Sequence, residues 1–215
     1  MSEAVDYFSN HALKLRFPWR LYHQPIVEAL QRAIAGAPGP DVLNVGSGPF
    51  LELSRLDTGP SRFTLCDIDA RAIEVARELH GARLARTDVI PAGAPLPYPE
   101  ASFDLVVSMD VIEHLGDPRP WLRELVRVLR PGGHLFLTTP NYGSMSLTIL
   151  ELTALELIAR IQGFSRRHLH PTKFTAQRLR HQLAAEGLDR IIVTPIALGW
   201  VLSAFAIRND AEGTP

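Results

Sequence analysis

The order of short apolar runs along the chain constrains the fold more than any other feature of the sequence. Five runs rich in β-branched and aromatic residues have the length and pattern of strands, and helical patterns or loops lie between them. They are residues 41–45, 63–67, 82–87, 103–109 and 134–140. Alternation of this kind is typical of βαβ units and predicts an α/β fold with a mostly parallel sheet. Two later runs, 190–195 and 199–208, predict two closing strands.

Capping residues predict where three of the helices begin. Asp69 and Thr175 each precede a helical pattern, and their side chains can accept the N–H groups of a first helical turn. Asp117 and Pro118 are expected at the N-cap and the first helical position of a further helix, because proline is tolerated there. Residues 130–133, with the sequence Arg-Pro-Gly-Gly, are expected to end that helix sharply.

The length of 215 residues is that of one domain, so we expect a single domain spanning the whole chain. Helical patterns also fill residues 1–35 and 144–162, outside the regular alternation. We expect them to cover the functional site, and a dimer interface or ordinary core packing is the alternative for both. The expected parts are an N-terminal helical cap (1–35), a core (41–140), a lid insertion (141–173) and a C-terminal helix with closing strands (174–208).

Charge and composition argue against several classes of partner. Lys and Arg together number 22 and Asp and Glu 23, so no net field draws the chain to nucleic acid or to an anionic membrane. No run of about 18 uncharged apolar residues is present, because Glu151, Glu156 and Arg160 interrupt the most apolar segment. The chain has one cysteine, Cys66, and its N-terminus lacks the basic-then-apolar order of a secretory signal. We therefore expect a reducing, cytoplasmic location.

A glycine turn and an acidic residue mark a candidate ligand site. Gly46, Ser47 and Gly48 follow the first strand pattern, where glycines allow a tight turn and a close approach of backbone N–H groups to a ligand. Asp67 lies about 20 residues later at the end of the second strand pattern, where a carboxylate can accept both hydroxyls of a ribose. A nicotinamide-dinucleotide fingerprint needs glycine three positions after Gly48, and Leu51 stands there. Dinucleotide binding is therefore disfavoured.

Four longer segments occur in a fixed order and cover residues 40–140. They are VLNVGSGP, CDIDARAIEVAR, LPYPEASFDLVVSMDVIEHL and ELVRVLRPGGHLFLTTPN. Together they resemble the class I S-adenosylmethionine-dependent methyltransferase family, in the small-molecule branch that contains the ubiquinone-pathway O-methyltransferases. The resemblance implies a Rossmann-like fold with a seven-stranded, mostly parallel sheet, helices on both faces, an antiparallel last strand and helical cap elements. It also implies S-adenosyl-L-methionine as cofactor, S-adenosyl-L-homocysteine as product and a small molecule as methyl acceptor.

The resemblance gives candidate roles to the residues around the glycine turn. Gly46, Ser47 and Gly48 would line the methionine part of the cofactor, and Asp67 would hold the ribose. Ile68 would flank the adenine, and Asp88 with Val89 would contact the adenine amino group. Met109 would line the cofactor pocket. Met109 fits ordinary core packing almost as well. The sequence departs from the family pattern twice. Asn44 stands where the family has an acidic residue, although its amide can still hydrogen-bond near the cofactor, and Phe50 replaces a third glycine.

Acidic and histidine side chains follow the central strand pattern. Asp110, Glu113 and His114 match the acidic-x-x-Glu-His ligands of the ubiquinone-pathway members, so the resemblance implies a Mg²⁺ site there. The alternative, which we favour, is that these side chains brace the pocket without a metal. His114 is the first candidate for a general base, with Glu113 beside it, because imidazoles exchange protons near neutral pH. His168 and His170 are second candidates, and both also fit a role in shaping their loop.

We therefore expect a methyltransferase that acts on a small apolar or aromatic molecule as a monomer or homodimer, with O-methylation favoured by the Glu113-His114 pair. N- or C-methylation of a metabolite is one alternative. A non-catalytic S-adenosylmethionine-binding partner protein is another, encouraged by Asn44 and Phe50. A dehydrogenase function is disfavoured, because the sequence contains no Tyr-x-x-x-Lys pair to supply the usual acid. The Asp-x-Asp pattern of metal-dependent glycosyltransferases occurs at residues 67–69, but the glycine turn before it fits a nucleoside better.

Overall fold

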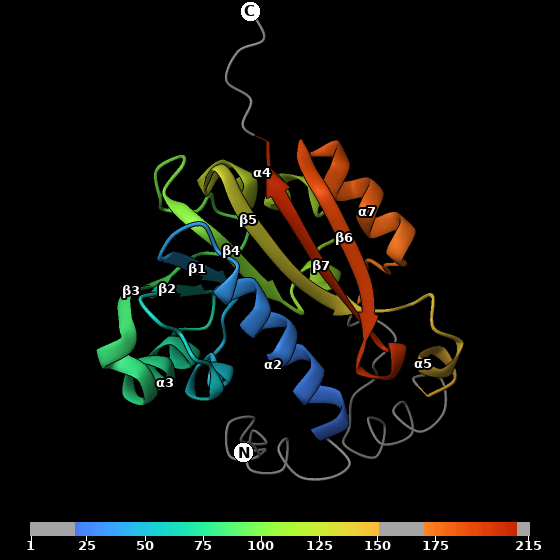
Figure 1. Cartoon of the computed structure of the whole chain (residues 1–215), viewed down its shortest axis with the longest axis horizontal. Helices are drawn as coiled ribbons and strands as arrows, with labels where there is room; N and C mark the ends of the chain where they lie inside the picture. Colours follow the sequence, from blue (N-terminus) through green and yellow to red (C-terminus); the bar gives the residue numbers. More distant parts are fainter. Residues whose placement is uncertain (1–19, 151–169, 210–215) are drawn as a thin grey trace, which may run out of the picture.

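A seven-stranded sheet forms the centre of the computed structural model, which describes residues 20–150 and 170–209 (Figure 1). The strands are β1 (Asp41–Val45), β2 (Arg62–Asp67), β3 (Leu84–Val89), β4 (Phe103–Met109), β5 (Leu129–Pro140), β6 (Leu188–Ile196) and β7 (Val201–Arg208). Their order across the sheet is β3-β2-β1-β4-β5-β7-β6. All seven predicted strands are present, and only β5 differs from its predicted range by more than two residues at either end.

The first five strands pair in parallel, and β7 runs antiparallel to both of its neighbours. Parallel ladders join β3 to β2, β2 to β1, β1 to β4 and β4 to β5. β7 pairs antiparallel with β5 and with β6. A short 3-10 helix, η6 (Ala197–Gly199), joins β6 to β7, and so short a connection suits antiparallel neighbours. The predicted Rossmann-like sheet with an antiparallel last strand is confirmed.

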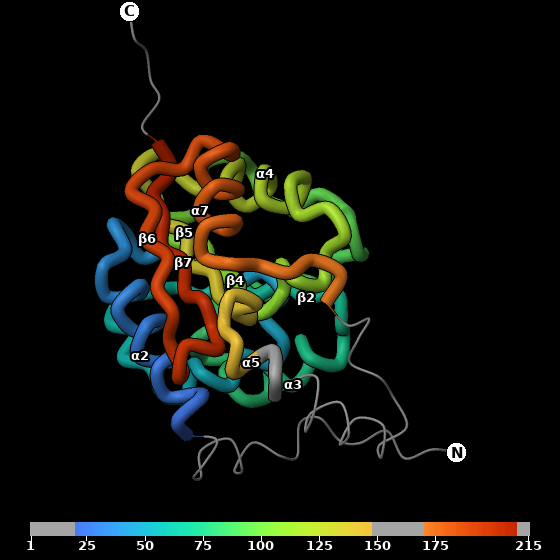
Figure 2. Tube along the Cα trace, turned by 90° about the vertical axis from the view of Figure 1, so that its right-hand side faces the viewer, coloured from blue at the N-terminus to red at the C-terminus, as the bar shows by residue number. Residues whose placement is uncertain are grey.

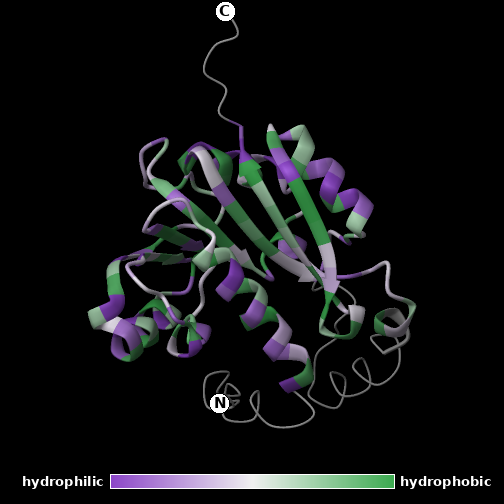
Figure 3. Ribbon diagram, viewed as in Figure 1, coloured by the Kyte–Doolittle hydropathy of each residue, from purple (hydrophilic) through white to green (hydrophobic). Residues whose placement is uncertain are grey.

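Helices cover both faces of the sheet. They are α2 (Arg20–Ala35), α3 (Ala70–His80), α4 (Arg119–Val128), α5 (Met145–Leu150) and α7 (Ala176–Ala185), with the 3-10 helices η1 (Leu51–Arg55), η2 (Gly81–Arg83) and η3 (Ile112–His114). α2 and α3 pack with η1 on one face, and α4 and α7 pack on the other (Figure 2). Hydrophilic and hydrophobic residues alternate around α2 and α7 in Figure 3, as expected for helices with one buried face. Within the described ranges, no helix has the length and apolar character needed to cross a membrane.

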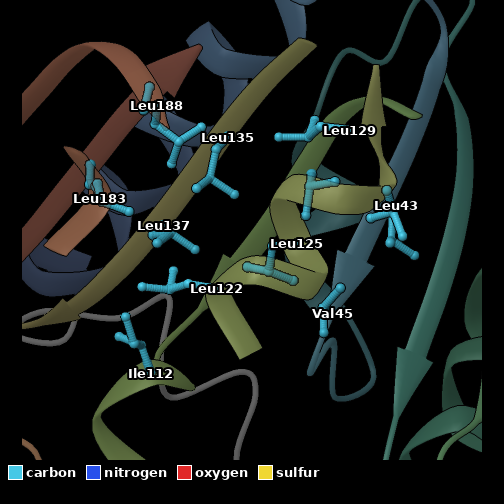
Figure 4. Packing of buried hydrophobic residues seen from close by; sticks show 14 of the residues in the cluster. Leu43, Val45, Ile112, Leu122, Leu125, Leu129, Leu135, Leu137, Leu183 and Leu188 are labelled. Atoms are coloured by element: carbon cyan, nitrogen blue, oxygen red, sulfur yellow. The ribbon is translucent and has the colours of Figure 1, made fainter. Parts of the chain in front are cut away.

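The core between the sheet and α4 is built largely from leucines. Leu122 and Leu125 of α4 lie close to Leu135 and Leu137 of β5 (Figure 4), and each of the four is at most 1% exposed. Complete burial of one such side chain contributes roughly 1.5–3 kcal/mol through the hydrophobic effect. Residues 103–108 of β4 are all buried, as expected for a central strand of a parallel sheet covered on both faces.

The predicted caps of two helices are confirmed, and a third helix begins one residue later than predicted. The side chains of Asp69 and Thr175 accept backbone N–H groups in the first turns of α3 and α7. In α4, Pro118 is the N-cap and Arg119 the first helical residue. The Asp117 carboxylate nevertheless accepts the backbone N–H of Arg119 at 3.1 Å. Asp117 therefore still supplies a hydrogen-bond acceptor to the first turn, although it lies one residue before the N-cap.

α4 ends at Val128, as the Arg-Pro-Gly-Gly sequence predicted, but β5 begins at Leu129, so the predicted strand start at residue 134 is wrong. Leu129 pairs with Phe103, and the register of β5 against β4 then shifts before regular pairing resumes at His134. Gly132 has a φ of 71°, a left-handed conformation that glycine adopts at no steric cost. The Arg-Pro-Gly-Gly sequence therefore forms an irregularity inside a longer strand.

Arg130 joins the amino-terminal ends of two central strands. Its guanidinium lies 2.6 Å from the carboxylate of Asp104 and 3.1 Å from that of Asp41. The backbone N–H of Asp41 also donates to the Asp104 carboxylate, at 2.9 Å. Asp41 begins β1 and Asp104 is the second residue of β4, so these contacts tie β1, β4 and β5 together at one end of the sheet.

Candidate functional site

A cavity of about 1480 Å³ lies at the carboxyl ends of the parallel strands. Its walls come from the turns after β1, β2 and β4, the loop after β3, and the N-terminal parts of α2 and α4. Ligands of open α/β sheets bind at this end of the strands. Eight of the residues predicted for the site line this cavity: Gly46, Ser47, Gly48, Asp67, Ile68, Met109, Asp110 and His114.

The turn after β1 has the backbone conformation that its glycines were predicted to allow. Gly46 and Gly48 have φ values of 67° and 52°, in the left-handed region. The backbone N–H groups of Gly46 and Ser47 both donate to the carbonyl of Cys66 in β2, at 2.8 and 3.1 Å. A Cβ atom on Gly46 would lie 2.4 Å from Cγ2 of Val111, which follows β4. Glycine is therefore needed at position 46 both for its φ and for this close approach.

The Asp67 carboxylate is held in place by two backbone N–H groups. Oδ2 accepts the N–H of Gly48 at 2.7 Å, and Oδ1 accepts the N–H of Asp69 at 2.9 Å. A carboxylate has about four acceptor positions, so capacity for ligand hydroxyls is left on the same two oxygens. Because the first of these bonds comes from the glycine turn, the carboxylate and the turn are positioned as one unit at the cavity wall.

Asn44 and Phe50 show how the two departures from the predicted pattern are accommodated. Asn44 lies in β1, its side chain is fully buried, and neither its amide nitrogen nor its oxygen has a hydrogen-bond partner among the described residues. It is not one of the cavity-lining residues. Phe50 adopts a φ of 46° and is 1% exposed, with its ring 5.8 Å from that of Phe63. Aromatic packing thus offsets the strain of a left-handed conformation in a residue other than glycine.

We expect Asn44→Val to raise the free energy of unfolding by about 1–2 kcal/mol, because it removes two buried polar groups that lack partners. Valine is also well suited to a buried central strand. Urea denaturation of the ligand-free protein measures the change. Asn44→Ala removes the same amide but leaves a void, so it should be less stable than Asn44→Val. A loss of stability in Asn44→Val would mean that the amide has a partner.

Asp88 and Val89, predicted to contact the adenine, are not among the residues that line the cavity. The Asp88 carboxylate forms an ion pair with Arg86 at 2.7 Å and accepts the Tyr98 hydroxyl at 2.9 Å. Burial is the main cause that raises the pKa of Tyr98, so this phenol remains a hydrogen-bond donor. Burial likewise raises the pKa of Cys66, the neighbour of Tyr98, to about 12. The role of Asp88 and Val89 in adenine binding stays a prediction.

Two of the predicted catalytic residues, Glu113 and His114, lie together beyond β4, and His170, one of the second candidates, joins them. Potential ligand atoms of Glu113, His114 and His170 all lie within 4.8 Å of one another. Glu113 is 1% exposed, and its Oε2 accepts the Thr139 hydroxyl at 3.0 Å. Burial, followed by the nearby Asp110 carboxylate, raises the pKa of Glu113 to about 8. The prediction for His168 lies outside the described residues.

Several lining residues were missed by the sequence analysis. They belong to the N-terminal part of α2, the loop after β3 and the beginning of α4, for example His23, Ile90, Pro95 and Trp121. The loop after β3 and the start of α4 follow parallel strands, at the edge where ligands bind, and this position was the available signal. The helical pattern of residues 1–35 was expected to cover the site, and Tyr22, His23 and Ile26 of α2 do line the cavity, although the sequence did not single them out.

The fold and this cavity define a Rossmann-like α/β protein whose ligand site lies at the carboxyl ends of its parallel strands. Residues 43–137 match the model of a methyltransferase domain family. Over 124 residues the chain is 36% identical to a probable S-adenosylmethionine-dependent methyltransferase of Mycolicibacterium smegmatis. The matched region covers 57% of this chain and 46% of that protein. Over 169 residues it is 29% identical to a ubiquinone biosynthesis O-methyltransferase of Xanthomonas oryzae pv. oryzae. This match covers 73% of the chain and 68% of that protein.

Residues 43–137 are thus similar to a methyltransferase domain family and to S-adenosylmethionine-dependent methyltransferases, in agreement with the resemblance of the four sequence segments. The chain spans less than half the length of the mycobacterial relative. Solved structures share its fold. A methyltransferase from Aquifex aeolicus matches with a TM-score of 0.61 at 18% identity, over 91% of this chain and 95% of that one. The CurJ carbon methyltransferase matches with a TM-score of 0.68 at 16% identity, over 92% and 57%.

Proposed function

We propose that this chain transfers the methyl group of S-adenosylmethionine to a hydroxyl oxygen of a small apolar or aromatic molecule. The observation that carries the proposal is that His114, a group able to accept a proton, lines the same cavity as the glycine turn and Asp67. A cofactor held by the turn and an acceptor beside His114 would therefore share one cavity. The O-methyltransferase among the relatives agrees with an oxygen acceptor.

The residues at the turn fit the cofactor. Asp67 has acceptor capacity left for the two ribose hydroxyls, and Gly46 and Gly48 expose backbone to the cavity with no side chain in the way. Ile68 is 64% exposed beside the cavity and offers an apolar surface to an adenine ring. When bound, S-adenosylmethionine supplies a methyl group activated by its attachment to a sulfonium sulfur.

The rest of the cavity has room and apolar character for an acceptor. Its volume of about 1480 Å³ exceeds the roughly 300–1,000 Å³ of a typical small-molecule site, so a second molecule fits beside the cofactor. Ile26 of α2, Ile90 of the loop after β3 and Trp121 of α4 contribute apolar surface. Enclosure by such groups fixes the orientation of the two reactants, which is worth roughly 7–11 kcal/mol in favourable cases.

A hydroxyl acceptor must lose its proton, and His114 is the side chain that we assign to this task. Glu113 lies behind it in the protein interior, and Thr139 and the backbone of residue 172 fix Glu113 through hydrogen bonds. The backbone N–H of Thr172 donates to the Glu113 carbonyl at 3.2 Å, so the last residues of the proposed lid segment, 141–173, pack on η3. The contact supports a position of this segment near the acceptor, because His114 of η3 lines the cavity.

We expect His114→Gln to lower the rate of methyl transfer by about 10²–10⁴-fold, the usual contribution of one general base. The affinity for S-adenosylhomocysteine should stay the same, because the substitution leaves the glycine turn and Asp67 intact. Purified protein with radiolabelled S-adenosylmethionine and a panel of hydroxylated aromatic and apolar compounds measures the rate. The matched control is His181→Gln, an exposed histidine on α7 away from the cavity.

The same assay separates the remaining alternatives. Mass spectrometry of the product gives the methylated atom, and a methylated nitrogen or carbon would refute the oxygen acceptor while leaving methyl transfer intact. No transfer to any compound of a cell lysate, together with normal binding of S-adenosylhomocysteine, would instead favour a non-catalytic partner protein. Asn44 and Phe50, the two departures from the family pattern, are the features that favour that outcome.

A further inference from the structure

Three charged residues on one face of α4 line the cavity beside the loop that follows β3. They are Arg123, Glu124 and Arg127, and their spacing of three and four residues brings Arg127 next to both of the others on the helix surface. Residues 90–96 of the loop line the cavity as well. One side of the cavity is therefore built from this face of α4 together with the loop.

Glu124 and Arg127 hold the loop against the helix. The Glu124 carboxylate accepts the backbone N–H of Leu96 at 2.8 Å. The Arg127 guanidinium donates to the carbonyls of Leu96 and Tyr98 at 3.0 and 2.8 Å. An ion pair of 2.8 Å joins the two side chains, and Arg127 is the main cause that lowers the pKa of Glu124. Because hydrogen bonds with a charged partner are the stronger ones, this side of the cavity has its shape before a ligand binds.

Arg123, the third charged residue of this face, is not used in the same way. It is exposed, and within residues 20–150 and 170–209 no hydrogen bond or ion pair joins its guanidinium to another group. Asp117 is the acidic group whose pKa its charge affects, but two bonds of 2.9 and 2.8 Å already join Asp117 to Arg119. Arg119 is the main cause that lowers the pKa of Asp117, and Arg123 adds a smaller contribution. The N–H donors of Arg123 are thus available to a ligand in the cavity.

The surroundings of Arg123 indicate which anion it would bind. Pro120 and Trp121 line the cavity in the same stretch of α4 and offer apolar and aromatic surface. Asp110 and Asp117 also line the cavity, and their negative charges would repel a dianionic phosphate more strongly than a monoanionic carboxylate. One guanidinium matches one carboxylate, because it offers two parallel N–H groups to the two oxygens. These features together fit a carboxylate attached to an aromatic ring.

We propose that Arg123 binds a carboxylate group of the methyl acceptor, so that the acceptor is an aromatic hydroxy acid. The inference rests on the proposed function and narrows its substrate class. Arg123 and His114 line the same cavity, so one molecule would have its carboxylate at Arg123 and its hydroxyl at His114. The carboxylate takes no part in the transfer. His114 accepts the hydroxyl proton, the oxygen receives the methyl group, and the sulfonium sulfur of the cofactor becomes a thioether.

The test compares hydroxylated aromatic acids with their uncharged carboxamides. Hydroxybenzoates, hydroxyphenylacetates and hydroxycinnamates separate the carboxylate from the hydroxyl by three different lengths, and each carboxamide keeps the shape of its acid without the charge. Calorimetry measures their binding to the full-length protein saturated with S-adenosylhomocysteine, and radiolabelled S-adenosylmethionine measures methyl transfer. At least one acid should bind about 10–100-fold more tightly than its carboxamide. Its KM should be lower by the same factor, with little difference in kcat.

Variants of Arg123 assign this preference to one side chain. In Arg123→Gln the acid and its carboxamide should bind with similar affinity. Arg123→Lys keeps the charge without the two parallel donors, so it should retain part of the preference. Arg180→Gln is the matched control, because Arg180 is an exposed arginine of α7 outside the cavity and its replacement changes the net charge equally. This control should prefer the acid as strongly as the parent does.

Equal binding of every acid and its carboxamide by the parent protein would overturn the proposal, and so would an unchanged preference in Arg123→Gln. Tighter binding of a hydroxyphenyl phosphate than of every acid would overturn the assignment of a carboxylate. Methyl transfer to the carboxamides without any preference for the acids removes only the carboxylate site and leaves the proposed function intact. Tight, Arg123-dependent binding of an acid without methyl transfer to any compound would instead support the site and count against the proposed function.

Discussion

Asp67→Ala should weaken the binding of S-adenosylhomocysteine by about 100-fold or more. A hydrogen bond to a charged acceptor contributes about 1.5–3 kcal/mol, and the substitution removes the acceptor for two ribose hydroxyls. It also removes the acceptor that holds the N–H of Gly48, so the glycine turn loses a support at the same time. Isothermal titration calorimetry at neutral pH measures the affinity.

Two further variants make this result interpretable. Asp67→Asn keeps the size of the side chain and one oxygen, so its affinity should fall between those of the parent and Asp67→Ala. Asp69→Ala removes a carboxylate two residues away that caps α3 and does not line the cavity. It should cost about 1 kcal/mol of unfolding free energy and leave the affinity unchanged. Similar affinities for Asp67→Ala and the parent would remove the basis for cofactor binding at this turn.

Gly46→Ala should lower the free energy of unfolding by about 2–5 kcal/mol. The left-handed conformation costs an alanine about 1–2 kcal/mol, and its Cβ would lie 2.4 Å from Val111, which adds an overpacking cost of about 1–3 kcal/mol. Chemical denaturation measures the loss. Binding of the cofactor should weaken as well, because relief of the clash moves either the turn or the chain after β4, and both line the cavity.

Gly48→Ala separates the two causes. Gly48 also has a positive φ, but no atom lies within 4 Å of the position its Cβ would take, so only the backbone cost of about 1–2 kcal/mol is expected. Adding Val111→Ala to Gly46→Ala should recover part of the loss, since it removes the clashing methyl group. Equal losses for Gly46→Ala and Gly48→Ala would show that the contact with Val111 has no energetic importance.

The sequence was sufficient for the sheet because each strand has its own local signal. Apolar β-branched runs mark the strands, and Asp69 and Thr175 mark helix starts through hydrogen bonds within one turn. The strand β5 begins five residues before its predicted start at residue 134, and this difference has a physical cause. A glycine with positive φ serves a turn and a strand irregularity equally well, and only the pairing of Leu129 with Phe103 decides between them.

The candidate site was predictable for residues that directly follow a strand. It was not predictable for residues that are distant in the sequence and meet through tertiary contacts. The glycine turn and Asp67 follow neighbouring strands, so their meeting follows from a parallel sheet. The approach of His170 to Glu113 depends on tertiary contacts made across 57 residues of chain. The hydrogen bond from Tyr98 to Asp88 depends on the fold of the loop after β3, for which the sequence offers no local signal, whereas Arg86 and Asp88 lie two residues apart on β3 and share one face of the strand.

The ion pairs of Arg130 lie at the end of the strands far from the cavity, and this separation lets the two ends change independently. Substitutions around Arg130 should alter how much heat or urea the protein withstands without altering what it binds. Substitutions in the cavity that admit a new ligand can then lower the stability of the protein, while stabilising substitutions at the amino-terminal ends of the strands offset that loss. The length of the central strands thus separates the residues that stabilise the fold from the residues that determine ligand specificity.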